Sequence, residues 1–253
     1  MILEEFDPVK TAVFNAENCV NKIDGFPEVA VSCFSRVTFN KLLELFESRK
    51  IGKITPANMT IPVYEIEYKG KKIALFNAYM GAAGCVATLE DLFAMGVKKL
   101  VIFGTCGVLD NSINDCSIII PDSAVRDEGT SYHYMPSSEE ISVNEKYIEE
   151  FKRFLDEIHV SYHTGKVWTT DGIYRETRDK VIRRKEQGCI CVDMECSAVA
   201  AMAKFRGRDV LHFFYGADNL DAEQWDQRSL DNNDKIDEKH KIACIALEMA
   251  LRM

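Results

Sequence analysis

The chain has 253 residues, of which 47% are hydrophobic and 28% charged, and its formal net charge at pH 7 is −9. This size and balance are typical of a globular protein that buries a substantial core. The acidic balance excludes a general nucleic-acid binder, which needs a basic face, but it still allows a small anionic substrate held by a few local cations.

The sequence predicts neither a membrane segment nor a metal site. Its start, MILEEFDPVK, has early acids and lacks the apolar stretch of a secretory signal. The longest apolar runs, such as KLVIFGTCGVL, are too short to cross a bilayer. The nine cysteines are scattered without a CxxC pair. We therefore expect a cytoplasmic protein with reduced thiols, most of them small core residues, and with no bound metal or cofactor.

Short apolar runs recur along the chain and predict buried strands. The segment 63–79 is typical of two strands joined by a tight turn at Lys69-Gly70. The other expected strands are 28–34, 98–104, 116–122, 165–171, 189–195 and 209–218.

Helical patterns alternate with these strands. Apolar residues repeat at helical spacing over 86–93 before Gly96, over 198–203 before Gly207, and over 242–249 near the end of the chain. The alternation predicts an α/β fold in one domain spanning residues 1–253, with a central mixed β-sheet flanked by helices on both faces. In such sheets ligands bind at the carboxyl ends of strands.

The residues after each predicted strand are therefore the candidates for a site. Arg36 follows the first strand, Gly81 lies in a small-residue turn whose amides can hold an anion, and Thr105 lies between two glycines that permit close backbone approach. The later strands are followed by acids, among them Glu176, Asp193, Glu195 and Asp218. One such acid can be a helix cap, an ion-pair partner or a ligand, but the convergence of all of them favours a site.

Four blocks carry a resemblance to a known family. MGAAGCVATLEDLFAMGVKKLVIFGTCGVL, SAVRDEGTSYHYMP, VDMECSAVAAMA and GADN are similar, in this order, to segments of the purine nucleoside phosphorylase and uridine phosphorylase superfamily. The match runs from about Val29 to the closing helix. The resemblance implies a partly barrel-like sheet and a homo-oligomer, either a dimer or a hexamer built from dimers.

The resemblance also implies an activity. These enzymes use inorganic phosphate as co-substrate to cleave the N-glycosidic bond of a nucleoside, and they release the free base and ribose 1-phosphate. Glu195 matches the glutamate that accepts hydrogen bonds from the ribose hydroxyls, and Met194 and Met80 match methionines that pack on the sugar. Asp218 matches the aspartate that protonates the purine, and Arg228 is the candidate for its assisting arginine.

The base contacts are implied by position. Ile173 and Tyr174 precede Glu176-x-Arg178, which falls close to the Gln-x-Arg pair of uridine-directed members. For Asp193 three roles stay open: a base contact, a helix start, or no catalytic role. Since uridine-directed members usually lack the acid at the position of Asp218, the sequence favours a purine or 6-oxopurine substrate.

The phosphate site departs from the family pattern. Arg36 and Thr105, with Gly81, match phosphate-binding positions, but SCFSR replaces the usual Gly-Asp-Pro-x-Arg loop. Ile102 and Met59 stand where the family has two further arginines, and no histidine near the amino terminus is available for the 5′-hydroxyl. Either other cations compensate, or phosphate binds weakly, or water is the nucleophile. The candidate compensating cations are Arg126, Arg175 and Arg178.

Four functions remain open at this point: a purine nucleoside phosphorylase, a uridine-type phosphorylase, a nucleosidase of the same fold, and a non-catalytic nucleoside-binding protein. The lack of an acid in SCFSR counts against the nucleosidase, because hydrolytic relatives carry one there. A placed acid at Asp218 together with Glu195 counts against the simple binder.

Overall fold

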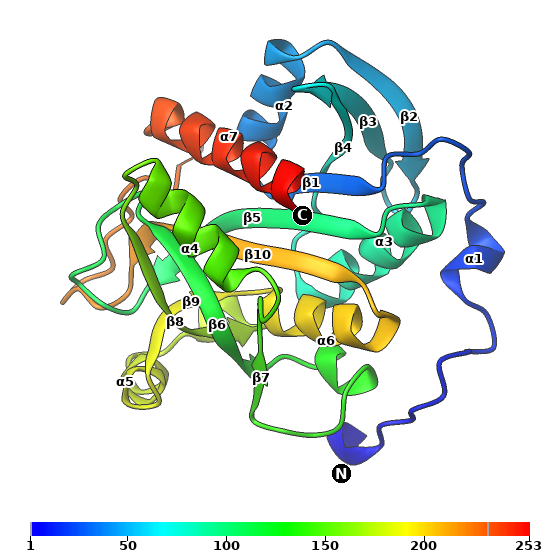
Figure 1. The fold of residues 1–253 in the computed structure, drawn as a ribbon. Coiled ribbons are helices and arrows are strands. Elements are labelled where there is room, and N and C mark those ends of the chain that lie inside the picture. Colours follow the sequence, from blue (N-terminus) through cyan, green and yellow to red (C-terminus); the bar gives the residue numbers. More distant parts are fainter. Residues whose placement is uncertain (1, 232) are drawn as a thin grey trace.

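The computed structural model describes residues 2–231 and 233–253. The strands of this part of the chain form one sheet, and helices cover both of its faces (Figure 1). The strands are β1 (Val29–Cys33), β2 (Ser48–Ile54), β3 (Ile61–Tyr68), β4 (Lys71–Asn77), β5 (Lys99–Val108), β6 (Ile118–Asp127), β7 (Glu140–Ser142), β8 (Tyr162–Thr170), β9 (Cys189–Asp193) and β10 (Asp209–Asn219). The α-helices are α1 (Ala16–Cys19), α2 (Arg36–Leu45), α3 (Ala82–Met95), α4 (Ile148–Glu157), α5 (Arg178–Glu186), α6 (Cys196–Arg206) and α7 (Ile236–Arg252). Short 3-10 helices are η1 (Ile2–Glu4), η2 (Thr130–His133) and η3 (Ile173–Arg175).

The sheet closes partly on itself. Its order is β10-β6-β8-β9-β5-β1-β4-β3-β2, and β10 also pairs with β5, so that β5, β10, β6, β8 and β9 form a closed ring. The sheet contains parallel pairs such as β1–β5 and antiparallel pairs such as β3–β4. The predicted α/β fold, with a mixed and partly barrel-like sheet between helices, is confirmed.

The core lies in layers on the two faces of the sheet. On one face, α2, α4 and α7 pack against β1, β5 and β10, where Phe103 and Phe213 stack with ring centroids 5.4 Å apart. On the other face, α3 and α6 bury Leu89 and Met202 in a common cluster. Burial of these side chains from water stabilises the sheet that carries the site.

Each predicted strand is present, but several ends differ. The turn at Lys69-Gly70 has positive φ values of 49° and 77°, as a tight hairpin turn requires. Gly96 and Gly207 cap α3 and α6 as expected. β5 is longer than predicted, so Thr105 and its flanking glycines lie inside the strand rather than in a turn after it. This extension brings Gly107, which has no side chain, into the wall of the candidate site.

The sequence analysis missed β2, α2, α4 and α5, and of these β2 and α5 have little apolar pattern. β2 is an edge strand rich in lysine and arginine, and α5 buries only Val181. Tertiary contacts, rather than periodicity, hold such segments in place.

The nine cysteines are all unpaired, and six of them are buried, which confirms that most of them are small core residues. Over the residues that the structure describes, no helix is both long and apolar enough to cross a membrane.

Candidate active site

A pocket lies at the carboxyl ends of β1, β4, β5, β9 and β10. It brings together most of the predicted site residues, which come from five separate parts of the chain: Met80, Thr105, Ile173, Glu176, Asp193, Met194, Glu195 and Asp218. Phe34, Cys106, Gly107, Val192, Leu220 and Leu230 complete the lining. The structure therefore gathers these predicted residues at the strand ends, as the sequence analysis expected of a site.

A β-bulge places Asp218 in this pocket. The pairing of β10 with β5 shifts between Gly216 and Asp218, so one extra residue reverses the alternation of side chains at the strand end. Gly107 lies opposite Asp218, and a Cβ atom there would come within 3.3 Å of Asp218 Oδ1 and 2.4 Å of Leu220 Cδ1. Only glycine allows β5 to approach Asp218 so closely.

Trp225 holds the carboxyl group of Asp218. Its indole Nε1 donates to Asp218 Oδ2 over 2.8 Å. Burial raises the pKa of Asp218, while the indole hydrogen bond and the charge of Arg228 act in the opposite direction. Arg228 makes its own bonds elsewhere, since its Nη1 donates to the Ile113 carbonyl over 2.9 Å and its Nε lies 3.5 Å from Asp226 Oδ2. In this structure Arg228 therefore acts on Asp218 through its charge, and not through a hydrogen bond to the carboxyl group.

Glu195 occupies the N-cap position of α6 and is 6% exposed. Its Oε1 accepts a hydrogen bond from the backbone amide of Gly81 over 2.5 Å. Burial and the neighbouring carboxyl of Asp193 raise the pKa of Glu195. The Gly81 amide was predicted to contact phosphate. The structure instead directs it to Glu195, which corrects that prediction and gives Gly81 a positioning role.

Asp193 starts the helix behind Glu195. Its Oδ2 accepts from the backbone amides of Glu195 and Cys196 over 2.8 and 2.6 Å, and its Oδ1 accepts from Thr169 Oγ1 over 2.6 Å. Burial raises the pKa of Asp193, and these hydrogen bonds counteract the effect. Because both oxygens are engaged, the structure supports the helix start among the three roles and leaves no free oxygen for the predicted base contact.

A buried polar cluster supports this turn. The Thr169 hydroxyl also accepts from the Ser197 amide over 3.1 Å, and the Ser197 hydroxyl donates to Glu128 Oε1 over 2.8 Å. These groups fix the first turn of α6, and with it the direction of the Glu195 side chain.

The base-contacting residues predicted in segment 173–178 take three different placements. Ile173 and Tyr174, on η3, are 49% and 94% exposed. Glu176 is half-buried in the pocket, where burial and the nearby Asp218 raise its pKa to about 7. Arg178 lies outside the lining of this pocket.

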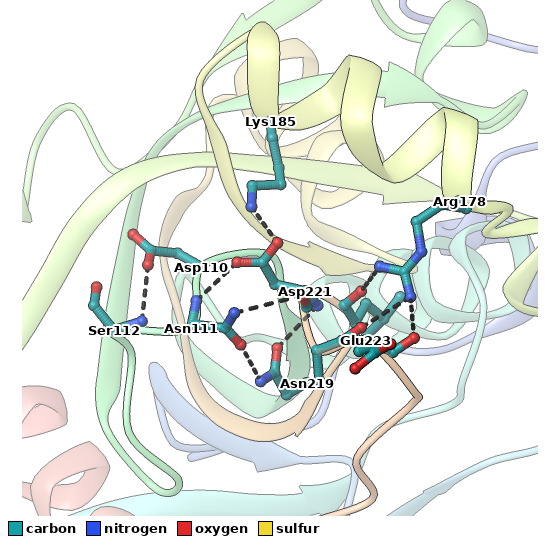
Figure 2. A network of polar contacts seen from close by, with 10 residues as sticks. Asp110, Asn111, Ser112, Arg178, Lys185, Asn219, Asp221 and Glu223 are labelled. Atoms are coloured by element: carbon teal, nitrogen blue, oxygen red, sulfur yellow. Dashed lines mark hydrogen bonds and ion pairs between the residues drawn. The ribbon is translucent and has the colours of Figure 1, made fainter.

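Arg178 holds a loop instead of a base. Its guanidinium donates to the carbonyl oxygens of Leu220, Ala222 and Glu223 over 2.9 to 3.2 Å (Figure 2). All of its observed hydrogen bonds go to this segment after β10. The prediction that Arg178 contacts the base is therefore wrong for this structure.

Cations are absent from the described lining of the pocket, which includes four carboxylic acids and no lysine, arginine or histidine. Arg36 begins α2 as an exposed residue outside this lining, although Thr105 belongs to it. Arg126 is buried and donates to the segment 131–138, and Arg175 is exposed on η3. None of the candidate compensating cations lies in the described pocket wall.

The sequence analysis missed Trp225, Phe34 and Leu220. Trp225 lies in an irregular segment between β10 and α7, where no periodicity indicates its partner. Its closeness to the GADN block was the only available signal. Among the described residues, no group of three or more histidine, cysteine, aspartate or glutamate side chains is arranged to hold a metal ion.

Comparison with known proteins identifies the family of this chain. A family model described as the phosphorylase superfamily matches residues 28–250. The chain belongs to the phosphorylase superfamily. The guanosine phosphorylase of Halorubrum lacusprofundi is a relative whose sequence is 22% identical to this chain over 190 residues. The aligned part covers 75% of this chain and 78% of the relative.

Two solved structures show the same fold. A uridine phosphorylase from Vibrio fischeri superposes with a TM-score of 0.78 at 23% identity, covering 93% of this chain and 96% of the other. A futalosine hydrolase mutant of Helicobacter pylori superposes with a TM-score of 0.70 at 15% identity, covering 90% and 99%. The phosphorylase-superfamily fold therefore includes enzymes named for phosphorolysis and for hydrolysis.

Proposed function

We propose that the protein cleaves the N-glycosidic bond of a purine nucleoside, with inorganic phosphate as co-substrate, to give the free base and ribose 1-phosphate. The observation that supports this most directly is that one pocket holds both Glu195 and Asp218. The first is a carboxyl group suited to the sugar hydroxyls, and the second is a carboxyl whose pKa is raised by burial, as an acid for the leaving base needs.

The chemistry divides between these two groups. Glu195, fixed by the Gly81 amide and by the start of α6, accepts hydrogen bonds from the ribose hydroxyls and holds the sugar for attack. As the bond breaks, positive charge develops on the sugar beside the Glu195 carboxyl. Because burial and Asp193 raise the pKa of Glu195 to about 8, its stabilisation of this charge increases as the pH rises toward that value. Asp218, oriented by Trp225, gives its proton to the ring nitrogen of the departing purine. Met194 and Met80 line the same pocket and pack on the sugar.

Phosphate is proposed to enter beside Thr105, with Arg36 as the cation that matches the family pattern. A specific observation favours hydrolysis as the second candidate: the described pocket lining combines four carboxylic acids with no cationic side chain. Such a wall offers a phosphate dianion no cationic hydrogen-bond donor, whereas water needs none.

The two candidates differ in their products. The experiment incubates the protein with inosine, guanosine, adenosine and uridine, with and without phosphate, in water enriched in ¹⁸O. Phosphorolysis yields ribose 1-phosphate only when phosphate is present, and purines are expected to react faster than uridine. Free ribose carrying ¹⁸O, formed at the same rate without phosphate, would replace phosphorolysis with hydrolysis. No cleavage of any nucleoside would reject the proposed function.

Arg36→Ala tests the phosphate contact. We expect it to raise the KM for phosphate about tenfold or more while the KM for the nucleoside stays within about twofold, since one charge-assisted contact is lost. Lys41→Ala, which removes an exposed cation from the same helix, is the matched control. An unchanged phosphate KM in Arg36→Ala would remove Arg36 from the phosphate site.

The substrates proposed as partners are thus a nucleoside and phosphate, and we also propose that the protein forms a homo-oligomer. Met80 lines the pocket but is 69% exposed, and Met59 is 44% exposed. Cover by a second copy would remove this apolar surface from water. Light scattering at micromolar concentration measures the mass, and a monomer would contradict the proposal.

A further inference from the structure

A second chamber adjoins the nucleoside pocket. It shares Ile173, Glu176, Asp218, Leu220 and Leu230 with that pocket. Glu195 and Thr105 line the nucleoside pocket alone, whereas Tyr174, Val181 and Trp225 line the chamber alone. Because Glu195 marks the sugar and Asp218 the base, the chamber continues the pocket beyond the base.

The wall of the chamber is mostly apolar and includes two aromatic rings. Tyr174 and Trp225 are 94% and 57% exposed, while Val181 is buried. Arg178 is the cation among the described lining residues, but its guanidinium already donates to three backbone carbonyls. The chamber therefore offers rings and aliphatic surface rather than an anion site.

Several contacts hold this wall in a fixed shape. Arg178 joins α5 to the carbonyls of residues 220–223, and Lys185 of the same helix forms an ion pair with Asp221 (Figure 2). Asn111 accepts from Asn219 Nδ2 over 2.6 Å, and its backbone amide donates to Asp221 Oδ2 over 3.1 Å. The segment that carries Leu220 and leads to Trp225 is thus anchored on both sides.

We propose that the chamber binds an apolar substituent on the base, and that the preferred substrates are purine nucleosides with an alkyl or arylalkyl group on the exocyclic nitrogen at position 6. This inference rests on the proposed function. Position 6 is next to the N7 edge that Asp218 protonates, so a group at position 6 projects past Asp218. Glu176, on the boundary of the two spaces, can accept from the exocyclic N–H that joins the substituent to the ring.

Turnover of matched substrates tests the proposal. We expect kcat/KM for N6-benzyladenosine to exceed that for adenosine about tenfold or more, because a phenyl ring leaves water for an apolar wall. Tyr174→Ala should reduce this ratio at least about threefold, and it should fold normally because Tyr174 is almost fully exposed. Ile182→Ala is the matched control, since Ile182 is an exposed apolar residue of α5 outside both linings and should leave the ratio unchanged.

Binding of the free bases gives a reading that needs no turnover. Calorimetry should show N6-benzyladenine binding about tenfold more tightly than adenine, with the advantage reduced in Tyr174→Ala. If the substituted base binds more tightly but no nucleoside is cleaved, the proposed function fails and the chamber assignment stands. If adenosine is cleaved but the benzyl group weakens both turnover and base binding, the chamber assignment is overturned.

A second copy of the chain is the competing occupant. A wild-type dimer that becomes a monomer in Tyr174→Ala, together with no advantage for the benzyl group, would assign the chamber to a subunit interface and overturn the proposal. A ratio that is the same in the wild type and Tyr174→Ala would overturn it as well.

Discussion

Glu176→Gln is expected to stabilise the protein at alkaline pH and to leave its stability unchanged at acid pH. Glu176 is half-buried beside Asp218, and its pKa in the folded protein is about 7 instead of an ordinary 4.5. Below about pH 4.5 the carboxyl is protonated in both the folded and the unfolded chain, so it resembles glutamine. Between pH 4.5 and 7 the unfolded chain loses the proton while the folded protein keeps it, so the free energy of unfolding falls as the pH rises.

The size of the effect follows from the two pKa values. For a fully buried group, a rise in pKa from 4.5 to about 7 lowers the free energy of unfolding above pH 7 by about 3 kcal/mol. Because Glu176 lies partly open to water, screening lowers our expectation to about 2 kcal/mol. Relative to the wild type, Glu176→Gln should therefore gain about 2 kcal/mol in unfolding free energy between pH 4 and pH 8.5.

Urea unfolding of both proteins across this pH range measures the difference, and the comparison cancels the other titrating groups. Glu186→Gln is the matched control, because Glu186 is an exposed glutamate at the end of α5. In an Asp218→Asn background the gain should shrink, since Asp218 contributes to the raised pKa of Glu176. A stability difference between wild type and Glu176→Gln that is the same at pH 4 and pH 8.5 would refute the reasoning.

Three further predictions concern the nucleoside pocket. Asp218→Asn should lower kcat for purine cleavage about 100-fold or more with little change in base affinity, measured by stopped assay and calorimetry, and full activity would exclude its role as the acid. Trp225→Phe removes a hydrogen bond that favours ionised Asp218, so the alkaline limb of the kcat/KM profile should move to higher pH; a move to lower pH would contradict this. Asp193→Ala removes three hydrogen bonds at the start of α6 and should lower the free energy of unfolding by about 3 kcal/mol in urea, whereas a loss below about 1 kcal/mol would show that the turn is held by other contacts.

The sequence determined the fold class, and it predicted residues that the structure gathers in the candidate site. Alternating strand and helix patterns indicated an α/β sheet, and the rule that ligands gather at strand ends selected Glu195, Asp218 and Thr105, which the structure brings into one pocket. These inferences succeeded because they depend on local periodicity and on the order of elements along the chain. Segments without an apolar stripe, such as β2 and α5, gave no such signal.

Tertiary structure alone decided which partner each polar group takes. The Gly81 amide bonds to Glu195, the Arg178 guanidinium to a loop, and Asp193 to the start of its own helix. Each choice depends on where distant strands end relative to one another, and a bulge at Ala217 sets the direction of Asp218. Periodicity fixes which side of a strand is buried, but hydrogen-bond partners between residues far apart in the sequence are fixed only when the closed ring of β5, β10, β6, β8 and β9 brings them together.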